Sequence, residues 1–264
     1  MTINNKLINL YNKNGYLILK LFSKKDINYF EKLITNKAKK TLKKNTFNLP
    51  KYHNYVNEEE HNKIIKNTTR CISVKRSIIK KIEQYKIISD ILKTRWNHSK
   101  FYIPNLEYLI GKSKKTSLRN IKKNEILFRI VPPKSVSYSK TAPEHVDLNA
   151  GKIINHKNKI LIPSSFSIWV PIIGFTKKYT LRFSPGSHLV NHPLNKIKKQ
   201  SKYISPVFDK KYINKFEFKR LNLNIGEVIF FDLNLLHGGA DNLGTNSRTS
   251  LEIRLYNHQK IKFK

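Results

Sequence analysis

Three residues of the chain have the types and spacing of a metal site. His145 and Asp147 stand two positions apart in EHVD, and His237 follows the apolar run VIFFDLNLL. In an extended chain, side chains two positions apart face the same way, so His145 and Asp147 converge on one point. Two histidines and one carboxylate are the ligand set of non-haem Fe(II) sites that keep coordination positions open. An H-x-D pair by itself, however, also occurs as a solvated pair in a loop.

A second chemical feature is Arg248, which follows His237 by eleven residues and immediately precedes the run TSLEIRLYN. On a strand, one face would carry Arg248, Ser250, Glu252 and Arg254, and the other Thr249, Leu251, Ile253 and Leu255. A buried guanidinium needs an anion, and a carboxylate matches its two-donor geometry. A dicarboxylate cosubstrate would meet this need if its other end bound the metal, with Ser250 as a further donor.

Two alternatives to that interpretation of Arg248 remain open. The arginine would form a structural ion pair with Glu252 or Asp147, or Arg254 would bind the carboxylate in its place. The eleven-residue spacing favours Arg248 as the carboxylate partner.

The remaining histidines are predicted to have no metal role. Five lie among polar residues and are expected at the surface: His53, His61, His98, His156 and His258. His188 and His192 are four apart, a spacing that binds metals on a helix. Gly186 and Pro193 leave room for only a short turn there, so we expect no metal between these two histidines.

The elements that would position these residues are mainly strands. After Glu125 the chain has short runs rich in Ile, Phe, Val and Tyr, separated by Pro, Gly, Asn and Ser: LFRIVPP, SFSIWVPII, YTLRFSPGS, GEVIFFDL and TSLEIRLYN. This pattern of short apolar runs separated by turn residues predicts an antiparallel β-domain.

The preceding part of the chain is predicted to be helical, with one strand. Residues 16–19 are a short apolar run suited to a strand, and Ser23 with Asp26 has the spacing of a capping box. The apolar spacing after it predicts a helix, and 77–96 is predicted to be a second amphipathic helix. Residues 43–70 are expected to be loop with a short helix, and 112–124 a basic connector.

Composition further restricts the classes of protein to which this chain could belong. The chain has 264 residues, 39% of them hydrophobic, and a formal net charge of +35. Such a charge indicates a polyanionic partner such as nucleic acid. Lys, Asn and Ile all have AT-rich codons, however, and the lysines are spread along the whole chain, so codon bias is the favoured explanation. No apolar run long enough for a membrane span or signal peptide is seen. The single Cys71 excludes an intrachain disulfide and fits the cytoplasm.

Four segments, taken in order, resemble the Fe(II)/2-oxoglutarate-dependent dioxygenases, and most closely their phytanoyl-CoA dioxygenase-like branch. NKNGYLILKLFSKKDINYFEKLI resembles the opening strand and helix of that family, and EHVD its H-x-D motif. IWVPIIGFTKKYTLRFSPGSH resembles the segment from a strand tryptophan to the Pro-Gly-Ser-His turn. GEVIFFDLNLLHGGADNLGTNSRTSLEIRLYN resembles the closing strand, distal histidine and Arg-x-Ser. The combination is much more specific than any one segment.

The resemblance implies an α+β protein with a mainly β core. That core would be a double-stranded β-helix of the jelly-roll or cupin-like kind, with N-terminal helices packed outside. One oxygenase domain would fill residues 1–264: a helical part with the first strand at 1–124, the core at 125–257 and a basic tail at 258–264. His145, Asp147 and His237 would be the catalytic iron ligands, and Arg248 with Ser250 would bind 2-oxoglutarate.

The implied activity is hydroxylation of a small-molecule metabolite with O₂, as 2-oxoglutarate is decarboxylated to succinate and CO₂. Halogenating relatives have a small residue where this chain has Asp147, which favours hydroxylation. The basic segment 148–163 is a candidate substrate lid whose lysines suit an anionic substrate. The alternatives are an oxygenase that modifies nucleic acid or another macromolecule, and a non-catalytic binding protein that retains the fold.

Overall fold

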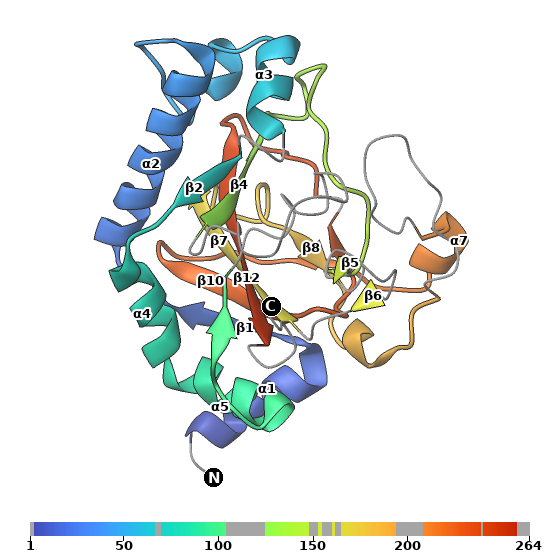
Figure 1. Ribbon diagram of the computed structural model, residues 1–264. Coiled ribbons are helices and arrows are strands. Elements are labelled where there is room, and N and C mark those ends of the chain that lie inside the picture. The colour runs from blue at the N-terminus through green and yellow to red at the C-terminus, as the bar shows by residue number, and fades with distance from the viewer. Residues whose placement is uncertain are drawn as a thin grey trace.

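Two β-sheets enclose the interior of the protein in the computed structural model (Figure 1). The structure describes residues 3–66, 70–103, 125–147, 153–154, 160–161, 165–193, 208–238 and 240–257. The expected connector at 112–124 and the basic tail at 258–264 lie outside these ranges. Of the expected lid, only β5 (Ile153–Ile154) and β6 (Ile160–Leu161) are described, and they pair with each other.

The main sheet is antiparallel and has the strand order β1-β10-β7-β12-β4-β2, with β3 paired to the end of β12. Its strands are β1 (Tyr16–Lys20), β2 (Cys71–Ser73), β3 (Phe101–Tyr102), β4 (Glu125–Val131), β7 (Ser165–Ile173), β10 (Glu227–Asp232) and β12 (Arg248–Asn257). The strands predicted from the apolar runs are therefore present. Two strands of the N-terminal part, β1 and β2, complete the edges of this sheet.

The smaller sheet has the order β11-β8-β9. It consists of β8 (Arg182–Phe183), β9 (Lys219–Arg220) and β11 (His237–Gly238). Side chains from both sheets meet between them, in an apolar cluster of Trp169, Phe183, Leu223, Ile229, Phe231 and Leu235. This arrangement of facing antiparallel sheets confirms the predicted fold class.

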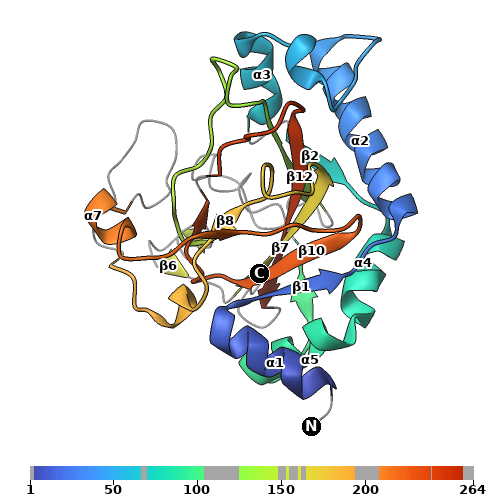
Figure 2. The same cartoon turned by 180° about the vertical axis from the view of Figure 1, so that it is seen from behind.

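Helices cover the other face of the main sheet (Figures 1 and 2). They are α1 (Ile3–Asn14), α2 (Lys24–Leu42), α3 (Glu58–Ile65), α4 (Arg76–Gln84) and α5 (Lys86–Trp96), and the short elements elsewhere are η1 (Tyr52–Asn54), η4 (Ser187–Leu189) and α7 (Lys210–Ile213). Leu251, Ile253 and Leu255 of β12 are fully buried in this layer with helix residues such as Phe30 and Ile34. The alternation predicted for β12 is therefore confirmed on its apolar face.

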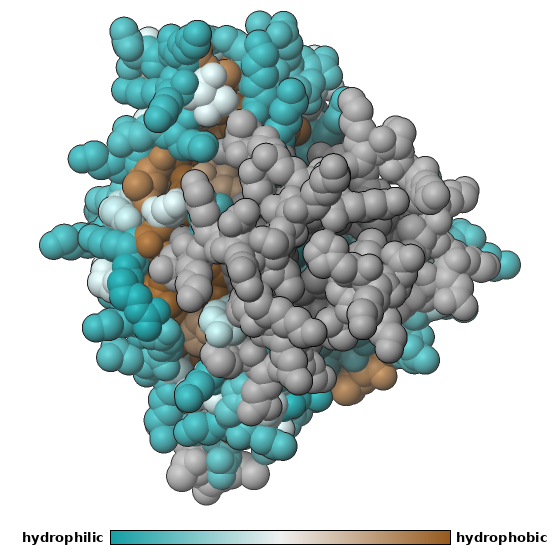
Figure 3. All heavy atoms as spheres, viewed as in Figure 1, coloured by the Kyte–Doolittle hydropathy of each residue, from teal (hydrophilic) through white to brown (hydrophobic). Residues whose placement is uncertain are grey.

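The outer sides of the helices are hydrophilic where Figure 3 shows them.

Helix α2 begins as predicted, with Ser23 and Asp26 forming a reciprocal capping box, and it buries Ile27, Phe30 and Ile34. No helix among the described residues is long and apolar enough to cross a membrane.

The prediction of one helix over residues 77–96 is wrong. Tyr85 has φ −74° and ψ 104°, which ends α4 and starts α5. At about 100° per residue, a continuous helix would turn the pair Ile88 and Ile91 away from the pair Ile78 and Ile82 by about 130° on average. The break at Tyr85 lets both apolar stripes face the core.

Candidate metal centre

A backbone bridge places the two candidate histidine ligands side by side. The N–H of His145 donates to the carbonyl of His237 at 2.8 Å, and the N–H of His237 donates to the carbonyl of His145 at 2.9 Å. Such a reciprocally bonded antiparallel pair fixes the spacing of both residues. Because His237 lies on β11, the H-x-D segment is attached to the free edge of the smaller sheet.

The rings of both histidines present the same nitrogen to Asp147. His145 Nδ1 lies 2.7 Å from the carbonyl oxygen of Pro143, and His237 Nδ1 lies 2.9 Å from that of Leu235. A carbonyl only accepts, so each Nδ1 carries the proton and each Nε2 has its lone pair available. The Nε2 atoms lie 3.8 and 3.9 Å from Asp147 Oδ1.

His145 and Asp147 are in the protonation states that metal binding requires. Burial and the neighbouring His237 lower the pKa of His145 to about 4, which keeps its ring neutral. Burial raises the pKa of Asp147, but Arg254 and then His237 outweigh it and hold this pKa below its usual value. A neutral imidazole and an ionised carboxylate bind a cation without first losing a proton.

The donor set fits a mononuclear iron centre. The ligand atoms of His145, Asp147 and His237 all lie within 4.8 Å of one another, and the three residues are buried. In the part of the chain that the structure describes, this is the only such group of three or more His, Cys, Asp or Glu. Two imidazole nitrogens and one carboxylate oxygen suit Fe(II) with positions left open, and no thiolate that would favour structural zinc is present.

Two residues of the main sheet also donate hydrogen bonds to the carboxylate of Asp147. Ser167 Oγ donates to Asp147 Oδ2 at 2.7 Å, and Arg254 Nη2 donates to Oδ1 at 2.9 Å. Arg254 further bonds to Glu252, which accepts from Arg129 at 2.8 Å. The strand ion pair considered for Arg248 therefore exists, but Arg254 forms it.

Arg248 is buried, and among the described residues it has no carboxylate partner. Its Nη1 donates to the backbone carbonyls of Tyr179 at 2.9 Å and Ala240 at 2.8 Å. Its Nε is buried and has no hydrogen-bond partner among the described residues. Burial, followed by repulsion from Arg220 and Arg129, lowers the pKa of Arg248 to about 9. The structural ion pair of Arg248 with Glu252 or Asp147 is therefore absent.

Ser250 lies on the same strand face as Arg248, as predicted from the alternation. The pairing of β12 with β4 runs without interruption from Arg248 opposite Val131 to Glu252 opposite Leu127. On the β7 side the register shifts between Thr249 and Ser250, next to Pro171. Proline has no N–H for the ladder, so an irregularity at this position is expected.

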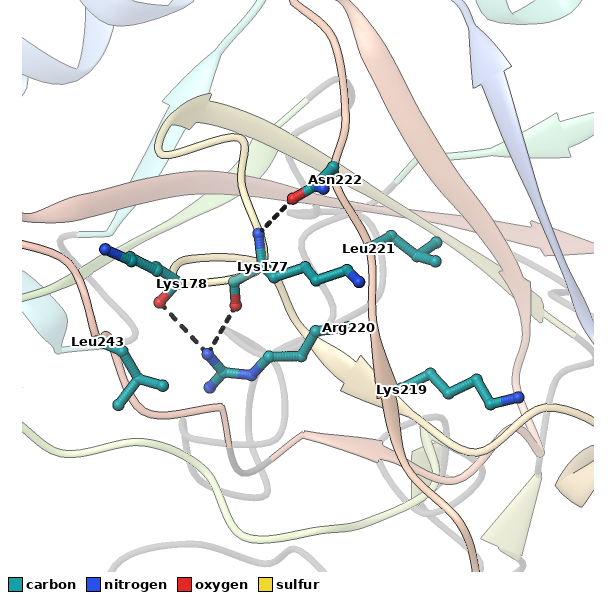
Figure 4. Close-up of a pocket in the computed structure, with 7 residues that line it drawn as sticks. All are labelled: Lys177, Lys178, Lys219, Arg220, Leu221, Asn222 and Leu243. Atoms are coloured by element: carbon teal, nitrogen blue, oxygen red, sulfur yellow. Dashed lines mark hydrogen bonds between the residues drawn. The ribbon is translucent and has the colours of Figure 1, made fainter.

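A basic pocket is lined in part by Lys177 and Lys178, which precede Tyr179, a hydrogen-bond partner of Arg248. It has a volume of about 580 Å³ and is lined by Lys177, Lys178, Lys219, Arg220, Leu221, Asn222 and Leu243. Figure 4 shows the Arg220 guanidinium directed at the carbonyl oxygens of Lys177 and Lys178, to which it donates. None of the candidate metal ligands lines this pocket, so it is separate from the metal centre.

His188 lies on the short turn η4, His192 follows three residues after that turn ends, and each ring forms its own hydrogen bonds. His188 Nε2 lies 3.2 Å from the carbonyl of Asn12. Both ring nitrogens of His192 are engaged, at 2.7 Å from Tyr212 Oη and 3.2 Å from the carbonyl of Asn234. These contacts fit a structural role for both histidines.

The prediction that His61 lies at the surface is wrong. His61 is buried against Tyr52, whose hydroxyl lies 3.0 Å from its Nδ1. His61 lies on α3, which buries His61 and Ile64. The polar residues EEEHN at the start of this helix gave no sign in the sequence of a buried face. His156 and His258 lie outside the described residues.

The burial of His61 leads to a pH prediction. Desolvation lowers its pKa from 6.5 to about 4, so the unfolded chain binds more protons between these values. Stability contributed by neutral His61 is complete above pH 6.5 and is lost as the pH falls towards 4, on the order of 1 kcal/mol per pH unit. Urea unfolding between pH 7.5 and 4.5 should show a shallower dependence in His61→Gln than in wild type. His98→Gln serves as the control, and equal slopes for wild type and His61→Gln would contradict the prediction.

The sequence patterns did not predict that Ser167 and Arg254 contact Asp147. Ser167 alternates with Phe166 and Ile168 in SFSIWV, which marks a polar position on an inward strand face. That pattern could indicate a residue at the site but not its partner. Arg254 was considered only as the partner of a cosubstrate carboxylate, whereas it binds Asp147.

Comparison with known proteins agrees with the geometry. Residues 127–250 match the family model of phytanoyl-CoA dioxygenase (PhyH). No curated protein sequence matches the chain. A structure of EctD from S. alaskensis with 2-oxoglutarate and 5-hydroxyectoine has a TM-score of 0.58 and 15% identity, covering 98% of this chain and 77% of that one.

Two further similar structures come from nogalamycin biosynthesis. The alpha-ketoglutarate-dependent carbocyclase SnoK has a TM-score of 0.55 and 10% identity, covering 97% of this chain and 84% of that one. The epimerase SnoN, in complex with Fe³⁺, alpha-ketoglutarate and nogalamycin RO, has a TM-score of 0.54 and 13% identity, covering 96% and 83%. These likenesses show a shared fold. Together with the family match, they confirm the resemblance recognised in the sequence: the chain carries a phytanoyl-CoA dioxygenase (PhyH) domain over residues 127–250.

Proposed function

We propose that this protein is an Fe(II)/2-oxoglutarate-dependent oxygenase that hydroxylates a small-molecule metabolite in the cytoplasm. One observation carries the proposal. The face of β12 that holds Asp147 through Arg254 also carries Arg248, a buried guanidinium that has no carboxylate partner among the described residues. The domain assignment supports the class of chemistry.

His145, Asp147 and His237 would hold the iron through two imidazole nitrogens and one carboxylate oxygen. When bound, Fe(II) supplies the site where O₂ is activated as 2-oxoglutarate is oxidised to succinate and CO₂. The backbone carbonyls of Pro143 and Leu235 keep both imidazoles in the tautomer that leaves Nε2 available.

Arg248 would bind the remote carboxylate of 2-oxoglutarate, with Ser250 assisting. A buried cation without a counter-ion costs several kcal/mol, and a bound carboxylate would offset that cost. Arg254 is the weaker candidate because Asp147 and Glu252 already occupy its guanidinium. The carboxylate of 2-oxoglutarate would bind the side of the Arg248 guanidinium that includes Nε. This nitrogen has no hydrogen-bond partner among the described residues.

Hydroxylation is the outcome best supported by the residues at the centre. Asp147 occupies the third ligand position, so no space is left there for a halide. The structural neighbours include a carbocyclase, an epimerase and EctD with 5-hydroxyectoine, so this fold hosts several outcomes. The substrate is proposed to be a small molecule, and the lysines of segment 148–163 suit an anionic one.

The test is an anaerobic titration of the purified protein with Fe(II) and 2-oxoglutarate, followed by admission of O₂. A visible metal-to-ligand charge-transfer band and subsequent succinate formation are the expected results. Folded wild-type protein that binds Fe(II) but shows neither the band nor succinate would refute the role of 2-oxoglutarate. Folded protein that binds no Fe(II) would refute the oxygenase as a whole.

A further inference from the structure

Ser167 and Arg254 together hold the carboxylate of Asp147. They are directly opposed residues on β7 and β12 in the main sheet, the two strands that lie side by side in Figures 1 and 2. Side chains of such a pair stand next to each other on one face. Each donates to a different oxygen of Asp147, although Asp147 belongs to the segment attached to the smaller sheet.

The two donors make the carboxylate oxygens unequal. Oδ1 is the oxygen that lies 3.8 and 3.9 Å from the two Nε2 atoms, so it is the one that faces a metal. Oδ2 is held by the Ser167 hydroxyl at 2.7 Å. A carboxylate held in this way offers one oxygen and not both to the metal.

The charge of Arg254 does not by itself favour a cation at this site. Its Nη2 lies 2.9 Å from Oδ1, so a divalent metal bound there would be close to the guanidinium and repelled by it. Glu252 lies 2.5 Å from the same nitrogen and offsets that charge. The contribution of Arg254 to metal binding must therefore come from orienting Asp147.

We propose that Ser167 and Arg254 are positioning residues that fix Asp147 before the metal arrives, so that it binds the metal through Oδ1 alone. This rests on the proposed function, because it assumes that His145, Asp147 and His237 hold a metal. Outer partners of metal ligands commonly set ligand orientation, and their loss weakens metal binding about 10- to 100-fold.

Co(II) titration of the protein without 2-oxoglutarate tests the proposal. Ser167→Ala should raise the dissociation constant for Co(II) about 10- to 100-fold. It should also change the visible Co(II) spectrum, because a carboxylate that binds through both oxygens raises the coordination number. The matched control is Ser165→Ala on the same strand and face, since the Ser165 hydroxyl is buried and has no hydrogen-bond partner among the described residues. Its affinity and spectrum should equal those of wild type.

Arg254 variants separate positioning from simple repulsion. Arg254→Met removes a positive charge, so repulsion alone predicts tighter Co(II) binding, whereas positioning predicts weaker binding. Arg254→Lys keeps a donor and the charge, and it should recover part of the affinity that Arg254→Met loses. Ser167→Ala keeps the test decisive if Arg254→Met fails to fold, because it leaves no charge unpaired.

The outcomes distinguish this inference from the proposed function. Wild-type protein that binds Co(II) with the same affinity and spectrum as Ser167→Ala would overturn the positioning role and leave the oxygenase proposal standing. Tighter binding by folded Arg254→Met would also overturn it for that residue. Folded wild-type protein that binds no Co(II) would overturn both proposals.

Discussion

Replacing His237 by alanine is expected to abolish the Fe(II)/2-oxoglutarate absorption band and to weaken Fe(II) binding by more than about 100-fold. Loss of an outer partner alone costs about 10- to 100-fold, and His237 would supply one of only three protein ligands. The backbone bridge between His237 and His145 does not need the ring, so the alanine variant keeps its pairing. Anaerobic titration with Fe(II) and 2-oxoglutarate measures both quantities.

The control for His237→Ala is His61→Ala. Both histidines are buried, at 5% and 3% exposure, but His61 bonds to Tyr52 and is not one of the candidate metal ligands. It should bind Fe(II) like wild type once folding is confirmed by circular dichroism. Wild-type affinity in His237→Ala would exclude this histidine from the metal centre.

Replacing Arg248 by methionine is expected to raise the 2-oxoglutarate concentration for half-maximal band formation by at least about 100-fold. Removing one partner of a buried charged pair costs about 3–5 kcal/mol, and each 1.4 kcal/mol is tenfold. Binding of Co(II) without 2-oxoglutarate should stay unchanged, because Arg248 donates to the carbonyls of Tyr179 and Ala240 and, among the described residues, to none of the candidate metal ligands. The two titrations together separate a cosubstrate contact from a metal contact.

Arg254→Met is the matched comparison and should give a different pattern of effects. It removes an ion-pair partner of Asp147 and Glu252. Without ligand, the melting temperature of Arg254→Met should therefore be lower than that of Arg248→Met. Its metal binding should also change without 2-oxoglutarate present. If Arg254→Met raised the 2-oxoglutarate requirement while Arg248→Met left it unchanged, Arg254 would be the carboxylate partner instead.

Local patterns determined much of this protein from the sequence alone. Alternation placed Arg248 and Ser250 on one face of a strand and Leu251 on the other, because successive side chains of a strand point to opposite faces. The i, i+2 spacing of His145 and Asp147 likewise depends only on extended backbone. The capping box of Ser23 and Asp26 is local in the same way. Each of these features involves residues only a few positions apart.

Only the tertiary structure decided which residues meet across long stretches of chain. The bridge between His145 and His237, and the register that sets Ser167 opposite Arg254, depend on how strands pair and not on any local pattern. A shift of one residue would turn every side chain to the other face. Local spacing alone also could not reveal the break at Tyr85 or the burial of His61. The sequence named the candidate metal ligands, and strand pairing decided that Arg254, and not Arg248, holds Asp147.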